Sequence, residues 1–384
     1  MKACILTWTS STGNWYDYLG RIIKKKLCEQ GIETILVEFK TIDLDLVKKL
    51  DKVEVDLFIS LGGVGSMIFT YSKLGKRNYW EERKSKFCVL HYDHPFYAIS
   101  NHSLDYSGCT HFYPCRTYYN AANLFCKKKF GKIVFLPGPL LADEKKLKIR
   151  EDNHFVILKN IYLDENKIEV KKRDKVFRSH VKKIDRLLSI EFEKNKYFDN
   201  HKFLLDYFLN ENITTNIGYV NIINFYTWCI GHITWKKINF VVKELSNFPL
   251  KMYGNNVKKY FKEHKNLKIF GNRRASESQE LFYSNYGIID FSMTEGFHDR
   301  TQRALINETS FLTNNDPNYE TFLKKFSNKF YNYSKDNLIE KCETIISNPI
   351  KHRNECAEIK FIYQKSYSWE KYLKTIISET TRKN

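Results

Sequence analysis

The first third of the chain alternates short apolar runs with amphipathic stretches, a pattern typical of repeated β-α units around a parallel sheet. The first apolar run predicts a buried strand over residues 3–8, and a Ser-, Thr- and Gly-rich loop follows it. A helix with one apolar face is expected over 15–30. The remaining predicted elements are a helix at 44–50 and strands at 34–39, 57–61, 87–91, 110–113 and 133–136.

After Pro137-Gly138-Pro139 and a charged connector over 143–153, the apolar run 154–158 predicts the first strand of a second domain. Helical periodicity then dominates, with helices expected at 176–194, 198–210 and 220–246. Strands and helices alternate again beyond this stretch, and the predicted strands are 250–253, 267–270, 286–292 and 310–313.

These patterns predict an α/β protein of two Rossmann-like β-α-β domains that face each other across a cleft. The first domain is expected over 1–145 and the second over 146–365, with extra helices at 175–245; a C-terminal helix over 366–384 would return to the first domain. Ligands of open α/β sheets bind outside the carboxyl ends of the strands. We therefore expect a site that both domains share.

Composition narrows the choice of partners only a little. The net charge of +19 suits a polyanion such as nucleic acid, an anionic lipid surface or an acidic glycan. The lysines, however, form short runs over the whole length, such as 24–26, 127–129 and 171–173, which favours a solvated surface over one binding stripe. Nucleic acid is therefore the less favoured partner. An enzyme that binds a diphosphate also needs positive potential, so the net charge fits both a polyanionic partner and a diphosphate ligand.

The nine cysteines include no Cys-x-x-Cys pair, and their odd number favours a reduced, cytoplasmic compartment. The N-terminal apolar run is too short for a signal peptide, and no window reaches the roughly 18 apolar residues of a membrane span. Peripheral contact with a membrane stays open. His and Cys show no metal-ligand spacing, so we predict neither a metal nor a cofactor.

The stretch from Tyr253 to Pro317 contains the most informative chemistry. Gly254 and Gly271 follow predicted strands, where the lack of a Cβ lets the backbone approach a ligand. Gly296-Phe297-His298-Asp299-Arg300 lies between a strand and a helix, so free backbone amides and a guanidinium can face an anion together. A diphosphate fits this arrangement. Arg300 would then stabilise the departing diphosphate, and the competing interpretation is a surface arginine in a salt bridge.

From about residue 250 to 369, the sequence resembles the C-terminal domain of the glycosyltransferase group that includes the CgeB-like spore-maturation proteins. The resemblance lies in the Tyr-Gly strand end, a second strand ending in Gly, the Glu280-Leu281 helix, Gly-x-His-x-Arg at 296–300, the Leu312-Thr313 strand and Ser368-Trp369-Glu370. It implies the GT-B fold and a metal-independent, hexosyltransferase-like activity with a nucleotide-sugar donor, a UDP-sugar above others. The donor-binding positions expected from the pattern and the resemblance are Gly13, Tyr253, Gly254, Asn255, Gly271, Asn272, Glu295, Gly296, His298, Arg300 and Arg303.

The sequence departs from the family pattern just after Arg300. Arg303 stands where the family often has a glutamate that is thought to bind the ribose, and Asn307-Glu308-Thr309 replaces a Gly-containing turn. The ribose contact is therefore unassigned. The departure also motivates a second hypothesis, a catalytically silent binding protein that keeps the fold.

The acceptor side is expected at His91-Tyr92-Asp93-His94-Pro95, which follows a buried strand. The resemblance implies that Asp93 and Pro95 match an Asp-x-Pro loop of the family. Asp93, then His91 or His94, would accept the proton of the acceptor hydroxyl if the reaction inverts configuration. The alternative is a loop held by side-chain hydrogen bonds to the backbone.

Some other features are weaker. Gly62, Gly63 and Gly65 predict a tight turn rather than a dinucleotide site, because they follow the third strand. Trp15 and Trp80 are candidates for stacking on an acceptor sugar, whereas Trp228 and its neighbouring aromatics have the spacing of a helix core. The leading acceptor is a hydroxyl of a glycan, a protein or a lipid-linked intermediate, and a phage-type DNA glucosyltransferase is the alternative enzyme.

Overall fold

Parallel strands form the core of each half of the chain. The computed structural model describes residues 1–8, 15–40, 44–66, 68–72, 75–83, 85–92, 95, 106–126, 130–140, 153–159, 161, 175–194, 200–213, 219–271, 282, 286–291, 299–314, 325–331 and 335–382. The chain divides into an N-terminal unit, Met1–Leu141 with Tyr363–Asn384, and a C-terminal unit, Ala142–Ile362.

The N-terminal unit contains a six-stranded sheet in the order β2-β1-β3-β6-β7-β8, in which every paired strand is parallel to its neighbour. The strands are β1 Lys2–Trp8, β2 Glu33–Phe39, β3 Leu57–Leu61, β6 Lys86–Leu90, β7 Tyr106–Tyr113 and β8 Phe130–Phe135. Residues 3–6 of β1 and all of β3 are buried, as expected of central strands covered on both faces. The apolar runs of the sequence therefore predicted these strands well.

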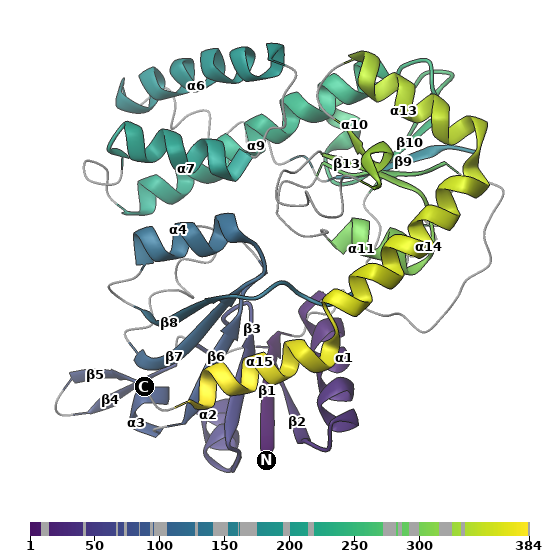
Figure 1. The fold of residues 1–384 in the computed structure, drawn as a ribbon. Helices are drawn as coiled ribbons and strands as arrows, with labels where there is room; N and C mark the ends of the chain where they lie inside the picture. The colour runs from purple at the N-terminus through teal and green to yellow at the C-terminus, as the bar shows by residue number, and fades with distance from the viewer. Residues whose placement is uncertain are drawn as a thin grey trace. The chain divides into compact units, whose positions relative to one another are not determined.

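Helices connect these strands and cover the sheet (Figure 1). They are α1 Trp15–Glu29, α2 Leu44–Asp51, α3 Tyr79–Arg83 and α4 Arg116–Cys126. The last helix of the chain, α15 Trp369–Thr381, packs against β6, β7 and α1 of the same unit. Ser368 caps its start by accepting a hydrogen bond from the Lys371 amide.

The glycine-rich segment after β3 is a tight turn, as the sequence predicts. Gly62, Gly63 and Gly65 all have positive φ, at 61°, 84° and 75°, which L-residues with a side chain rarely adopt. A Cβ at Gly62 would lie 2.6 Å from the Tyr16 ring. The Trp80 indole donates a hydrogen bond to the Gly65 carbonyl at 2.9 Å. Trp80 is fully buried, so the suggestion that it stacks on an acceptor sugar is wrong.

Sequence reasoning missed one element close to this turn. Strands β4 Phe69–Ser72 and β5 Gly75–Asn78 pair as an antiparallel hairpin outside the main sheet. Half of β5 is Lys76 and Arg77, so it lacks the apolar run that identifies a buried strand.

The C-terminal unit contains a second six-stranded parallel sheet, in the order β11-β10-β9-β12-β13-β14. Its strands are β9 Phe155–Leu158, β10 Leu250–Tyr253, β11 Leu267–Phe270, β12 Gly287–Ile289, β13 Phe311–Asn314 and β14 Phe330–Tyr331. Gly287 has φ 93°, and a Cβ there would lie 1.9 Å from the Ser310 carbonyl oxygen. Only glycine therefore lets β12 approach the start of β13 this closely.

The remaining elements of this unit are helical. They are α6 Lys175–Glu193, α7 Asn200–Asn210, α9 Tyr219–Glu244, α10 Val257–Tyr260, α11 Asp299–Ile306, the 3-10 turn η4 Ser327–Lys329, α13 Lys335–Ser347 and α14 Pro349–Ser366. Helices α6 and α7 both pack on the long helix α9 (Figure 1). Trp228 and Tyr226 of α9 are buried, which confirms the core interpretation of these aromatics. No helix among the described residues is long and apolar enough to cross a membrane.

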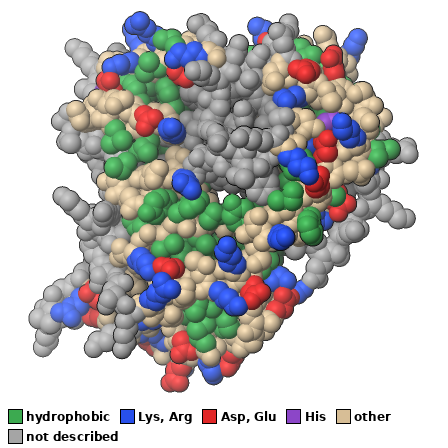
Figure 2. Space-filling view, in the orientation of Figure 1, with side chains coloured by type: hydrophobic (Ala, Val, Ile, Leu, Met, Phe, Trp, Pro, Cys, Tyr) green, Lys and Arg blue, Asp and Glu red, His purple; other side chains and the backbone are tan. Residues whose placement is uncertain are grey.

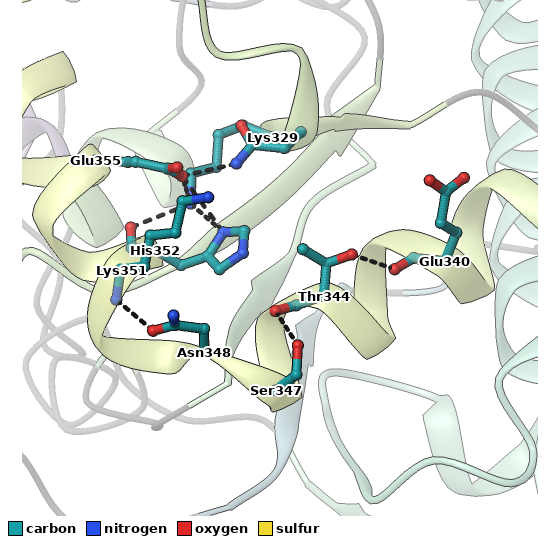
Figure 3. Close-up of polar contacts among 9 residues, drawn as sticks. Lys329, Glu340, Thr344, Ser347, Asn348, Lys351, His352 and Glu355 are labelled. Atoms are coloured by element: carbon teal, nitrogen blue, oxygen red, sulfur yellow. Dashed lines mark hydrogen bonds and ion pairs between the residues drawn. The ribbon is translucent and has the colours of Figure 1, made fainter.

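A buried charged cluster joins η4 to α14 (Figure 3). Lys329 is fully buried, and its ammonium donates to His352 Nδ1 at 2.8 Å and to the His352 carbonyl at 3.1 Å, and lies 3.1 Å from Glu355 Oε2. These three acceptors match the three N–H bonds of the ammonium. The Asn328 amide donates to the same Glu355 oxygen at 2.7 Å. Lys329 directly precedes β14, whose first residue, Phe330, pairs with Thr313 of β13.

Candidate functional site

The carboxyl end of β10 carries three of the predicted donor-binding residues. Tyr253 ends the strand, and Gly254 follows with φ 151°, a conformation that favours glycine. The Tyr253 and Asn255 carbonyls accept hydrogen bonds from the Lys159 and Ile161 amides at 3.0 and 3.1 Å. These bonds tie the segment that follows β10 to the segment that follows β9. The structure thus brings Tyr253, Gly254 and Asn255 to the ligand-binding edge of an α/β sheet.

Strand β11 ends beside β10 with Phe270 and Gly271. The Tyr253 and Phe270 rings stack almost in parallel, with centroids 4.6 Å apart and an interplanar angle of 11°. Gly271 is exposed, and no atom of the described residues lies within 4 Å of the position that a Cβ would take. Gly271 follows β11 at the same edge, as the sequence predicts, and ligand binding by its backbone stays a prediction.

Arg300 lies in the first turn of α11, which is the third element at this edge. It approaches Asp290, the first residue after β12, and Arg300 Nη1 lies 3.8 Å from Asp290 Oδ1. The side chain of Asp290 is 1% exposed and that of Arg300 is 23% exposed. A distance of 3.8 Å is too long for a hydrogen bond, and Nη1 is buried without a hydrogen-bond partner among the described residues. Asp290 thus compensates the charge of the guanidinium, while Nη1 donates no hydrogen bond to a described residue.

Arg303, one turn further along α11, has a different environment. Its guanidinium lies over the ring of buried Phe282, with Cζ 5.9 Å from the ring centroid. Such a contact is a cation–π interaction. The structure therefore places Arg303 against an aromatic of its own unit, and a role in ribose binding stays a prediction.

The turn after α11 adopts a left-handed conformation without a glycine. Glu308 has φ 54°, the left-handed conformation that a Gly-containing turn would supply. Lys360 of α14 donates to Glu308 Oε1 at 3.1 Å and to the Ile306 carbonyl at 3.0 Å, at the end of α11. One lysine thus stabilises both the strained residue and the free carbonyl end of the helix.

In the N-terminal unit, His91 directly follows β6 and contacts two residues of β7. His91 Nε2 lies 2.9 Å from His111 Nδ1, and the His91 ring stacks on Tyr113 at 4.5 Å. Both histidines are buried, and burial lowers the pKa of His111 from 6.5 to about 3. A neutral imidazole is therefore the direct partner of the predicted proton acceptor His91. Sequence reasoning missed His111, whose only signal was a histidine inside an apolar strand.

Lys and Arg side chains do not gather into one stripe on the face that Figure 2 displays; they are dispersed among Asp and Glu. This agrees with the short lysine runs of the sequence. Among the residues that the structure describes, no group of three His, Cys, Asp or Glu side chains is arranged to hold a metal ion. Independence from metals stays a prediction.

By sequence, the chain matches no family model and no curated protein. Its fold is similar to solved glycosyltransferase structures along their full length. Sucrose-phosphate synthase from Thermosynechococcus elongatus has a TM-score of 0.56 at 9% identity, over 98% of this chain and 97% of that chain. An α-glucosyltransferase in complex with UDP and a 13-mer DNA has a TM-score of 0.56 at 10% identity, over 100% of both chains. HepE from Anabaena, in complex with UDP-glucose, has a TM-score of 0.51 at 11% identity, over 99% of both chains.

The chain has the GT-B fold. The two Rossmann-like parallel sheets and these neighbours confirm the predicted fold class. Sequence identities of 9 to 11% support a shared fold and nothing more specific, so membership of the CgeB-like group stays a prediction.

Several predicted site residues lie outside the described part of this GT-B chain. They are Gly13, Asp93, His94, Asn272, Glu295, Gly296 and His298. Apart from Arg303, the residues that the structure does place form two groups. Tyr253, Gly254, Asn255, Gly271 and Arg300 lie at the carboxyl edge of the C-terminal sheet, and His91 lies at the corresponding edge of the N-terminal sheet.

Proposed function

We propose that this protein is a glycosyltransferase that moves a sugar from a nucleoside-diphosphate donor, a UDP-sugar above others, to a hydroxyl acceptor without a metal ion. The observation that carries the proposal is the environment of Arg300. Its guanidinium lies in the first turn of a helix at the carboxyl edge of a parallel sheet, with a buried donor atom that no described residue uses. Helix starts favour anions, and an arginine can bind phosphate oxygens in a bidentate manner.

The chemistry follows from this arrangement. As the glycosidic bond to the donor breaks, negative charge develops on the departing diphosphate, and a preorganised guanidinium stabilises that charge most in the transition state. The exposed backbone of Gly271, beside the stacked Tyr253–Phe270 pair, offers a place for the nucleoside at the same edge. On the acceptor side, we propose that Asp93, His91 or His94 accepts the hydroxyl proton if the reaction inverts configuration.

The acceptor in this proposal is a hydroxyl of a glycan, a protein or a lipid-linked intermediate. The similarity in fold to an enzyme solved with DNA keeps duplex DNA as an acceptor to test. DNA binding would weaken steeply with salt, because phosphate contacts release counterions. The dispersed lysines and arginines of Figure 2 favour the other acceptors.

The first experiment is a thermal-shift screen of the full chain against nucleoside diphosphates. A ligand that binds only the folded state raises the melting temperature, so the screen also identifies the base. The second measures donor hydrolysis and transfer by Arg300→Ala, which we expect to lower kcat by about 100-fold or more. Arg186→Ala, which removes an exposed arginine of the same unit, is the matched control and should leave kcat unchanged. No stabilisation by any nucleotide would support a catalytically silent protein, and unchanged turnover in Arg300→Ala would remove Arg300 from the mechanism.

A further inference from the structure

Asp290 is a buried carboxylate directly at the candidate diphosphate site, and sequence reasoning did not select it. Its backbone amide donates to the Leu312 carbonyl at 2.8 Å, which anchors it to the neighbouring strand β13. Its Oδ2 accepts a hydrogen bond from the Thr301 hydroxyl at 2.8 Å, and its Oδ1 faces Arg300 Nη1 at 3.8 Å. The two oxygens therefore contact consecutive residues of the first turn of α11.

The burial of this carboxylate requires compensation. Asp290 and Thr301 are each 1% exposed, so neither can exchange its partner for bulk water without a local opening. A charge removed from water is costly unless it is paired and hydrogen-bonded, and Thr301 and Arg300 meet these two requirements separately. The hydrogen bond from Thr301 orients the Asp290 carboxylate, and the carboxylate attracts the Arg300 guanidinium to one position.

The ion pair is loose and leaves one donor group of Arg300 unused by the described residues. At 3.8 Å, Asp290 attracts Arg300 but does not use the hydrogen-bonding capacity of Nη1, which is buried and has no hydrogen-bond partner in the described part of the chain. An anion such as a phosphate is suited to accept a hydrogen bond from this arginine nitrogen beside a helix start.

We propose that Asp290 and Thr301 are positioning residues that hold Arg300 in place for the diphosphate of the donor. This inference rests on the proposed function. Asp290 acts on the ligand in two opposite ways: it orients the arginine that binds the diphosphate, and its own charge repels the diphosphate. Removal of the Asp290 charge should therefore separate ground-state affinity from turnover, which a merely structural residue would not do.

Asp290→Asn keeps the size of the side chain and an oxygen for Thr301. We expect UDP affinity to stay within about 3-fold of wild type or to increase, because the repulsion is gone. We expect kcat to fall by about 10- to 100-fold, because a misplaced guanidinium loses most in the transition state. Thr301→Val, which fills the same space without a hydroxyl, should lower kcat by about 10-fold, and Thr301→Ser should restore most of it.

The decisive test compares Asp290→Asn in two backgrounds, the wild-type chain and Arg300→Ala. If Asp290 acts through Arg300, the substitution lowers kcat in the first background and has little further effect in the second. Equal effects in both backgrounds, or a parallel fall of UDP affinity, kcat and melting temperature, would overturn the positioning role.

Binding of inorganic pyrophosphate, measured by titration calorimetry on the same four full-length proteins, separates this inference from the proposed function. Pyrophosphate binding that depends on Arg300, with an Asp290→Asn effect confined to the wild-type background, supports the positioning role even if no sugar is transferred. In that case only the proposed activity fails. No pyrophosphate binding by the wild-type chain would overturn the positioning role itself.

Discussion

Lys329 offers a sharp test of how this fold tolerates a charge in its interior. Its side chain is fully buried, and its ammonium contacts His352 and Glu355 of α14 (Figure 3). The perturbation is Lys329→Met, which keeps most of the side-chain length and removes the charge. Burial alone would raise the pKa of Glu355, but the hydrogen bonds from Asn328 and Lys329 lower it below its usual value. Glu355 is therefore ionised at neutral pH and loses its countercharge in this variant.

Breaking a buried ion pair by removing one partner typically costs about 3 to 5 kcal/mol. Because the side chain of Glu355 stays 20% exposed and keeps Asn328, we expect about 3 kcal/mol, the lower end of that range. Glu355→Gln should be destabilising as well. The double variant should cost at least about 1 kcal/mol less than the sum of the two single variants, because neither charge is then left unpaired.

The assay is urea unfolding followed by tryptophan fluorescence, with hydrogen exchange of α14 amides to localise the effect. The control is Lys325→Met, which removes an ion pair with Glu358 whose side chains are 63% and 44% exposed. Surface pairs contribute little, so this control should change stability by less than about 0.5 kcal/mol. Additive costs of Lys329→Met and Glu355→Gln, or equal losses in Lys329→Met and Lys325→Met, would refute the reasoning.

Two further predictions concern pH and backbone strain. Burial, aided for His352 by the charge of Lys329, lowers the pKa of His352 to about 4, and burial lowers that of His111 to about 3. Below pH 6.5 the folded chain therefore binds fewer protons than the unfolded chain. The contribution of these histidines to stability is complete above this pH and falls on acidification toward pH 4. The free energy of unfolding falls by up to about 1.4 kcal/mol per pH unit for each histidine. Unfolding measured between pH 7 and 4.5 checks this, and a His352→Gln profile as steep as that of wild type would contradict the contribution of His352. Gly287→Ala should destabilise by more than about 3 kcal/mol, because its Cβ would overlap the Ser310 carbonyl and φ is 93°. Gly271→Ala, at an open position, should be nearly neutral for the melting temperature, and equal melting points of the two variants would show that the close approach of the strands relaxes cheaply.

Local pattern was sufficient for most of the fold. A buried parallel strand is a short continuous apolar run, and its neighbouring helix has an apolar face, so each is visible within its own residues. The strands of both sheets except the two-residue β14, together with the helices at 175–245, were predictable in this way. The placement of Tyr253, Gly254, Gly271 and Arg300 at strand ends and a helix start followed from the same information.

Only the tertiary structure decided which side chains meet. His111 lies beside His91 because β6 pairs with β7, and Lys329 meets Glu355 because α14 packs against the segment that precedes β14. Trp80 packs against Phe58 and Phe87 in the core, where the turn after β3 supplies a carbonyl for its indole N–H. In each case the contact depends on strand order and chain packing between segments 15 to 26 residues apart, which neither composition nor periodicity encodes. The sequence by itself thus determined most of the elements and the edge of the sheet where Arg300 lies. The pairing of Arg300 with buried Asp290 emerged only from the folded geometry, because packing, and not sequence pattern, sets the 3.8 Å distance between their atoms.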